Sequence, residues 1–199
     1  ILLVPEISLT PQTVNRFIAR FGKEQIAVLH SKLSIGERFD QWHKIHEGKA
    51  KIVIGARSAI FAPVKNLGIV IIDEEHDSSY KSEMAPRYDA KNVARYICKT
   101  VNVPLVLGSA TPDLETFYRA KKEEIMLLEL TKRANEAELP SIDIIDLREE
   151  LKAGNRSIFS ARLRELMEDR LSKGQQIMLF LNRRGYAGFV SCRACGHVI

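Results

Sequence analysis

A short apolar strand that ends in a cluster of acids constrains this chain more than any other feature. Residues 69–72 are Ile-Val-Ile-Ile, and the next four residues are Asp73, Glu74, Glu75 and His76. A continuous apolar, β-branched run is typical of a strand covered on both faces, as in a parallel sheet between helices. Because clustered carboxylates disfavour one another's charge, we expect this end of the strand to face a positively charged ligand.

Other short apolar runs alternate with helical patterns over the first 130 residues. We predict strands at 1–4, 25–30, 51–55, 68–73 and 104–108, and helices at 11–21, 35–45, 89–99 and 111–120. Thr111 is the expected N-cap of the last helix, with Pro112 as its first residue. The alternation predicts a doubly wound α/β fold, in which ligands bind outside the carboxyl ends of the strands.

The remainder of the chain predicts a second, incomplete unit. Residues 131–140 are polar, lack apolar periodicity and are expected to form a linker. After them we predict a strand at 141–146, a polar connection at 147–159, a helix at 160–174 and a strand at 175–181. The chain begins inside a predicted strand and stops shortly after a cysteine pair, so we expect it to be a piece of a longer protein.

Composition narrows the class of protein. The 199 residues carry a formal charge of +5, which favours polyanionic partners only mildly. No apolar run is long enough to span a bilayer, and three cysteines fit a reducing, cytoplasmic compartment. Cys192 and Cys195 have the spacing of half a zinc site, with a redox pair as the alternative. Cys98 adjoins the apolar stripe of a helix, and we expect a packed thiol.

The acids and a second polar segment suggest one kind of chemistry. An apolar strand ending in Asp-Glu suits a nucleoside triphosphatase, where the first carboxylate holds Mg²⁺ and the second activates water. Residues 108–111, Gly-Ser-Ala-Thr, follow another strand and are expected at the same edge of the sheet. Each segment also has a plain structural explanation, namely a solvated acidic loop and a capped helix start.

Seven segments, taken together and in order, resemble one family. They are VPEISLT, HSKLSIGERFDQW, IVIGARSAIFAP, IIDEEHDSSYK, PRYDAKNVARY, LGSATPDLE and FLNRRGYAGFVSCRACG. The set resembles the bacterial primosomal replication-restart helicases of superfamily 2. The resemblance implies two RecA-like motor lobes, of which 1–130 and 141–199 are parts, with a zinc-binding insertion in the second. It also implies ATP-dependent 3′-5′ unwinding of forked DNA, and primosome, helicase-loading and single-stranded-DNA-binding proteins as partners.

The resemblance assigns roles to particular residues. Asp73 is implied to hold Mg²⁺ and Glu74 to be the catalytic base, with Glu75 and His76 completing the acidic box. Residues implied to couple hydrolysis to movement are Gly108, Ser109, Ala110 and Thr111. Residues implied to lie near DNA are Pro5, Glu6, Thr10, Gly55, Arg57, Ser58, Tyr80 and Tyr88. Cys192 and Cys195 are implied to be the first pair of zinc ligands.

Some parts of the family pattern are missing from these residues. The phosphate-binding glycine loop and the arginine motifs of the second lobe are not in the sequence, so we expect that this piece alone does not hydrolyse ATP. Three alternatives remain open: another superfamily 2 translocase, a non-catalytic zinc-ribbon module that binds nucleic acid, and a hydrolase whose metal is ligated directly by Asp73, Glu74 and His76.

Overall fold

The structure is a computed structural model that describes residues 1–5, 11–132 and 140–180. The chain separates into two compact units, Ile1–Glu129 and Leu130–Ile199. Among the described residues, no helix is long and apolar enough to cross a membrane.

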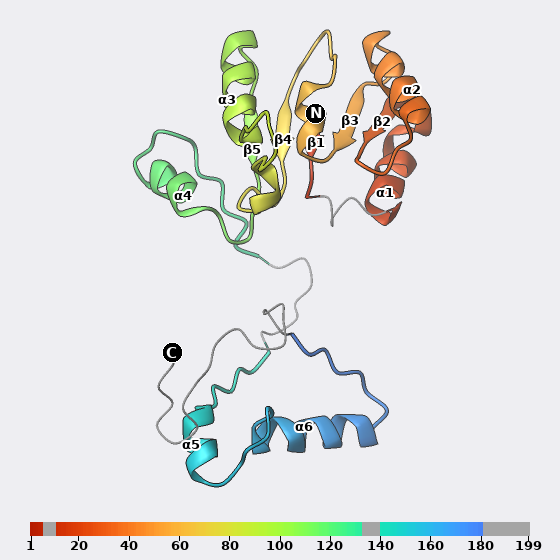
Figure 1. Ribbon diagram of the computed structural model, residues 1–199. Coiled ribbons are helices and arrows are strands. Elements are labelled where there is room, and N and C mark those ends of the chain that lie inside the picture. The colour runs from red at the N-terminus through yellow and green to blue at the C-terminus, as the bar shows by residue number, and fades with distance from the viewer. Residues whose placement is uncertain (6–10, 133–139, 181–199) are drawn as a thin grey trace. The chain divides into compact units, whose positions relative to one another are not determined.

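The first unit is built on one parallel sheet of five strands (Figure 1). The strands are β1 (Leu2–Leu3), β2 (Ile26–Leu29), β3 (Ile52–Gly55), β4 (Val70–Ile72) and β5 (Leu105–Leu107). Their order is β2-β3-β1-β4-β5, and every neighbouring pair is parallel. The five predicted strands therefore all form, each somewhat shorter than its predicted range.

Helices connect the strands, as a parallel sheet requires. The α-helices of this unit are α1 (Pro11–Phe21), α2 (Ile35–His46), α3 (Ala90–Val101) and α4 (Leu114–Lys121). Three short 3₁₀ turns accompany them: η1 (Lys23–Gln25), η2 (Arg57–Phe61) and η3 (Ser78–Tyr80). A capping box between Ser34 and Glu37 starts α2, and the side chain of Asp89 caps α3.

The two faces of the sheet bury different side chains. On one face, Leu3, Val53 and Ile72 pack in a large core with Ile45 of α2 and Ala94 of α3. On the other face, a smaller core contains Val4, Ile26 and Ile54, with partly buried side chains of α1 packed against it. The alternation of side chains along each strand places them on these two faces.

Among the described residues, no helix covers the second face at its β4–β5 end. Val106 is 41% exposed, and Ile71 is only partly buried. The expectation of strands buried on both faces therefore holds for the centre of the sheet and is wrong for this end. The apolar side of α2 is exposed as well: Ile35 is 90% exposed and Phe39 63%, while Ile45 makes the buried contact.

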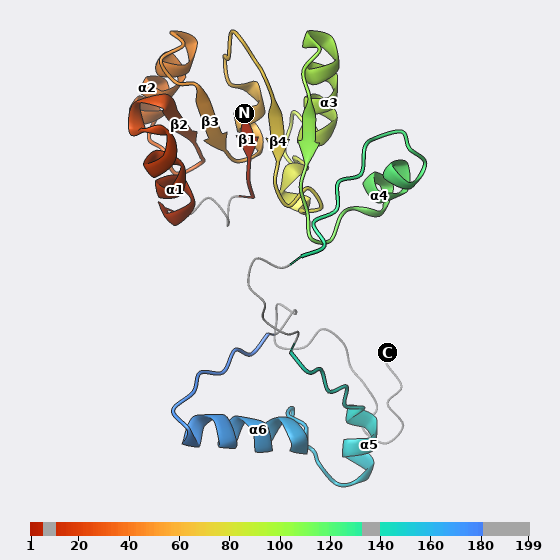
Figure 2. The same cartoon turned by 180° about the vertical axis from the view of Figure 1, so that it is seen from behind.

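The helix after β5 starts later than predicted. We expected residues 111–120 with Thr111 as the cap, but α4 begins at Leu114 and its N-cap is Asp113. The backbone N–H of Thr111 donates instead to its neighbour Ser109 Oγ, 3.0 Å away, which holds 109–111 as a turn. In both views α4 lies beyond the β5 end of the sheet (Figures 1 and 2).

The second unit contains helices but, within its described residues, no strand. Helix α5 (Leu147–Lys152) forms where a polar connection was expected, and α6 (Ala161–Ser172) forms within the predicted helix, capped by Ser160. The predicted strand at 141–146 is wrong, and residues 175–180 are not a strand either. Their apolar side chains are exposed, for example Ile144 at 93%. Strands typical of a covered parallel sheet need neighbours on both sides, and the described residues supply none.

Candidate functional site

The acidic residues lie at the carboxyl end of β4, an inner strand of the sheet. The backbone N–H of Asp73 donates to Leu3 O of the adjacent strand at 2.9 Å, which fixes where the loop begins. Glu74 has a φ of +45°, a conformation that costs a non-glycine residue on the order of 1 kcal/mol or more. Its N–H donates to Asp73 Oδ1 at 3.0 Å. The chain therefore turns sharply away from the strand direction at Glu74.

This loop contacts the Gly-Ser-Ala-Thr segment directly. The N–H of Gly108 donates to Ile72 O at 2.8 Å, and a Cβ at Gly108 would lie 3.6 Å from Asp73 Oδ1. His76 Nδ1 lies 2.7 Å from Ser109 Oγ, a hydrogen-bonding distance. The two polar clusters that the sequence predicted at one edge of the sheet are thus in contact, while Ala110 and Thr111 are exposed beside them.

The first two carboxylates are available to a ligand. The side chain of Glu74 is 44% exposed, and Asp73 is also exposed. In the described part of the chain, neither forms an ion pair with a lysine or arginine; Glu74 Oε2 lies 3.7 Å from His76 Nδ1. Carboxylate oxygens suit Mg²⁺, which binds proteins through one or two carboxylates and takes its other ligands from water and phosphate. These two residues fit that requirement.

A metal site made by protein side chains alone is a poorer match. No group of three or more His, Cys, Asp or Glu side chains is arranged to hold a metal among the described residues. The imidazole of His76 is engaged with Ser109. The geometry therefore favours a metal shared with a bound phosphate over direct ligation by Asp73, Glu74 and His76.

Glu75 faces the opposite way from its acidic neighbours. It is 1% exposed, and its N–H donates to Gly108 O at 3.0 Å. Its carboxylate accepts hydrogen bonds from the Lys91 ammonium at 3.0 Å, the Asp113 N–H at 2.6 Å and the Thr116 hydroxyl at 3.2 Å. Glu75 therefore joins β4, β5, α3 and α4, and does not reach the surface as Asp73 and Glu74 do.

Lys91 is shared between two carboxylates. Its ammonium also lies 3.0 Å from Asp113 Oδ2, and the whole residue is 7% exposed. Burial opposes the charge on Lys91, but hydrogen bonds from its ammonium to Glu75 and Asp113 outweigh burial and raise its pKa. The same hydrogen bond lowers the pKa of Asp113. Lys91 and Asp113 are therefore both charged near neutral pH.

Sequence reasoning missed Lys91, Asp113 and Thr116. The sequence did indicate that Lys91 is buried. It lies on the same face of the predicted helix as Ala94 and Cys98, which are both buried. A lysine on an apolar stripe requires a buried partner. Nothing in the sequence marked Glu75 as that partner.

Several residues predicted near DNA are buried. Gly55 ends β3, and a Cβ there would lie 2.4 Å from Leu29 O and 2.5 Å from Ala59 Cβ, so close packing requires this glycine. Pro5 is buried too. Glu6 and Thr10 lie outside the described residues.

Tyr80 also lies in the core. It is 1% exposed, and its hydroxyl donates to Asp73 O at 2.6 Å. Burial, reinforced by the nearby charge of Asp73, raises the pKa of this hydroxyl. A ring in this position does not present a face on which a base could stack.

The other predicted DNA-binding residues line a shallow groove of about 430 Å³. Arg57, Ser58 and Tyr88 contribute to its wall, together with Lys81 and Met84. Nη1 of Arg57 donates to the backbone oxygens of Ser79, at 2.9 Å, and of Lys81. The Arg57 guanidinium carbon also lies 5.7 Å from the centre of the Tyr88 ring.

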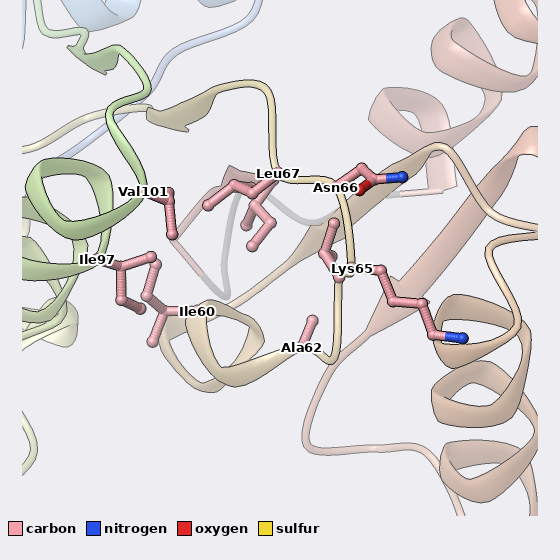
Figure 3. A pocket seen from close by; sticks show the side chains of 9 residues that line it. Ile60, Ala62, Lys65, Asn66, Leu67, Ile97 and Val101 are labelled. Atoms are coloured by element: carbon pink, nitrogen blue, oxygen red, sulfur yellow. The ribbon is translucent and has the colours of Figure 1, made fainter.

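A second pocket, of about 410 Å³, is separate from these residues (Figure 3). It lies near the amino-terminal ends of the strands, where Ile60, Ile97 and Val101 face one another and Lys65 extends away from them. None of the described residues that line it is acidic, so these residues offer no carboxylate to a cation. Cys192 and Cys195, predicted to bind zinc, lie outside the described residues. Cys98 is a free thiol in the core, as expected.

Comparisons with known proteins agree with this geometry. The family described as DEAD/DEAH box helicase matches residues 1–120. The chain is similar to the Replication restart protein PriA of Bacillus subtilis (57% identical over 198 residues), Synechocystis sp. (49% over 204 residues) and Treponema pallidum (46% over 199 residues). Each match covers 100% of this chain but only 24%, 24% and 29% of the respective relative. The chain thus spans a minor part of the length of these curated relatives.

Proposed function

The chain belongs to the DEAD/DEAH box helicase family, and from this premise we propose that it is part of the motor of an ATP-driven, 3′-5′ replication-restart DNA helicase. The observation that carries the proposal is the contact between His76 Nδ1 and Ser109 Oγ at 2.7 Å. It joins two exposed carboxylates to the segment after the neighbouring strand, at the edge where α/β sheets bind ligands. The relatives described as replication restart proteins support the cellular role.

Within this motor, the first two acidic residues carry the chemistry of hydrolysis. Mg²⁺ and ATP would supply the phosphoryl group and the positive charge that the acidic loop lacks. Asp73 would hold the metal ion with a carboxylate oxygen, directly or through water. Glu74, next along the chain and exposed, would orient a water molecule and take its proton. His76 would transmit movement of the loop to Ser109.

The groove beside Arg57 is the proposed DNA contact. The Lys81 ammonium and the remaining guanidinium N–H groups of Arg57 suit phosphate oxygens, and the partly buried Tyr88 ring suits a sugar or base. Several assignments remain predictions. The linker at 131–140 rests on its polar sequence, and zinc at Cys192 and Cys195 rests on their spacing and on the family resemblance. A second motor lobe from 141 and the primosome, helicase-loading and single-stranded-DNA-binding partners rest on the resemblance alone.

Glu74→Gln in the full-length protein tests the function. The substitution keeps the size of the side chain and removes the base, so DNA-stimulated ATP turnover should fall at least ~100-fold. ATP binding, measured with a fluorescent analogue, should remain within about threefold, because we expect Asp73 to hold the metal.

The matched control is Glu24→Gln, an exposed glutamate in η1. It should leave turnover unchanged. Turnover by Glu74→Gln near the wild-type rate would show that Glu74 is not the base. Absence of DNA-stimulated turnover in the wild-type protein would remove the motor proposal altogether.

A further inference from the structure

We propose that Lys91 is a positioning residue, which holds the acidic loop and the 108–111 segment in one arrangement. The inference deepens the proposed function and rests on it. Lys91 lies in the first turn of α3, outside both predicted motifs, and its ammonium is 3.0 Å from an oxygen of Glu75 and 3.0 Å from an oxygen of Asp113. A third element of the fold thus connects the two segments of the site.

The position of Glu75 in the chain makes this connection consequential. It lies between Glu74, the proposed base, and His76, which contacts Ser109. Asp113 follows the Gly-Ser-Ala-Thr segment by two residues. When Lys91 holds both carboxylates, the ends of β4 and β5 have a fixed spacing. That spacing sets the distance between His76 and Ser109.

The charges limit how far the two segments can separate. Glu75 is 1% exposed and Lys91 7%, so moving one away from the other would leave a buried ion without its partner. An uncompensated buried charge is strongly unfavourable. Exposed Asp113 can exchange Lys91 for water at less cost, because its side chain is 40% exposed. The geometry therefore predicts that the ion pair between Lys91 and Glu75 separates only at high cost, whereas the ion pair between Lys91 and Asp113 separates more easily.

A purely stabilising role would not require these charges. Replacement of a buried ion pair by apolar side chains of similar volume is often neutral or stabilising. The directional hydrogen bonds of the Lys91–Glu75 pair, by contrast, define one geometry. We therefore expect stability and activity to respond differently when the pair is removed as a unit.

The test compares Lys91→Met with the double variant Lys91→Met/Glu75→Gln in the full-length protein. Lys91→Met leaves the Glu75 carboxylate buried and should lower both Tm and the kcat of DNA-stimulated hydrolysis. The double variant removes both charges and should regain most of the lost Tm. Its kcat should remain about 10- to 100-fold low with KM for ATP within about threefold, because small misplacements of catalytic groups cost this much. Lys99→Met, an exposed lysine on the same helix, is the control and should match wild type.

A second measurement is independent of activity. Histidine-selective ¹⁵N spectra of this chain, which has five histidines, report the state of the His76 ring, with His76→Gln for assignment. In the double variant the Nδ1 signal should move towards that of an imidazole without a partner. An unchanged signal, or full recovery of kcat together with Tm, would overturn the positioning role. Inactive wild-type protein would instead count against the proposed function, with the spectra still deciding the role of Lys91.

Discussion

Gly55→Ala should destabilise the first unit strongly, although it adds only one methyl group. Gly55 pairs with Leu29 across β2 and β3, and Ala59 of η2 packs against it. The new Cβ would lie 2.4 Å from Leu29 O and 2.5 Å from Ala59 Cβ. Ordinary contacts begin at 3.4 Å, so the backbone of β2 and the η2 turn must each move by roughly 1 Å.

The cost follows from what has to move. Overpacking a core usually costs 1–3 kcal/mol, and the upper end applies when the displaced atoms belong to backbone. We therefore expect a loss of about 3 kcal/mol, less the few tenths of a kcal/mol that alanine gains by restricting the unfolded chain. For a chain of this length, that loss lowers Tm by roughly 6–12 °C.

Urea unfolding, followed by circular dichroism, measures this loss of stability. The urea concentration at the midpoint should fall, while the dependence of the unfolding free energy on urea concentration stays constant. Gly68→Ala is the matched control, because a Cβ at Gly68 meets no atom within 4 Å. It should change stability by less than about 1 kcal/mol. If Gly55→Ala unfolded within about 1 kcal/mol of wild type, the close packing of β2, β3 and η2 would be wrong.

Two further predictions concern single hydrogen bonds. Burial, with the charge of Asp73 second, raises the pKa of Tyr80 above its ordinary value of 10.0. The folded state therefore holds the hydroxyl proton more tightly than the unfolded state. The contribution of Tyr80 to stability is complete below pH 10 and is lost as pH rises above it. The free energy of unfolding of Tyr80→Phe should therefore fall less steeply with alkaline pH than that of wild type, and equal pH slopes for both proteins would contradict this. Ser34→Ala removes the capping box with Glu37 and should cost about 1 kcal/mol in urea unfolding, whereas Ser34→Thr should recover most of it.

Local patterns were sufficient for the strands and most of the helices of the first unit. Helix α1 has the bounds that its apolar spacing and Pro11 predicted, and the five apolar runs became the five strands. In each case the signal lies in one short segment, since the side chains that face the core recur with the period of the element.

Expectations failed where the outcome depends on distant residues. Thr111 has the chemistry of a cap, yet Asp113 occupies the N-cap position of α4. The Asp113 N–H donates to Glu75, which lies in another strand connection. The run at 141–146 has the composition of a strand, but pairing requires a neighbouring strand, which the described residues of its unit do not offer. A sequence pattern reports the preference of a segment and not the partner that satisfies it.

Residues 73–76 show at the scale of single residues that sequence does not reveal which partner a side chain will have. Four consecutive polar side chains look equivalent in sequence, and the family resemblance groups them as one box. The left-handed backbone at Glu74 breaks the alternation of the strand, so that Asp73 and Glu74 stay exposed while Glu75 enters the core. His76 then returns to the edge and reaches Ser109. Two carboxylates thus stay accessible to a ligand, one is buried inside the fold, and the imidazole contacts the neighbouring segment. This difference in placement follows from one backbone angle and one buried lysine, neither of which the composition of residues 73–76 reveals.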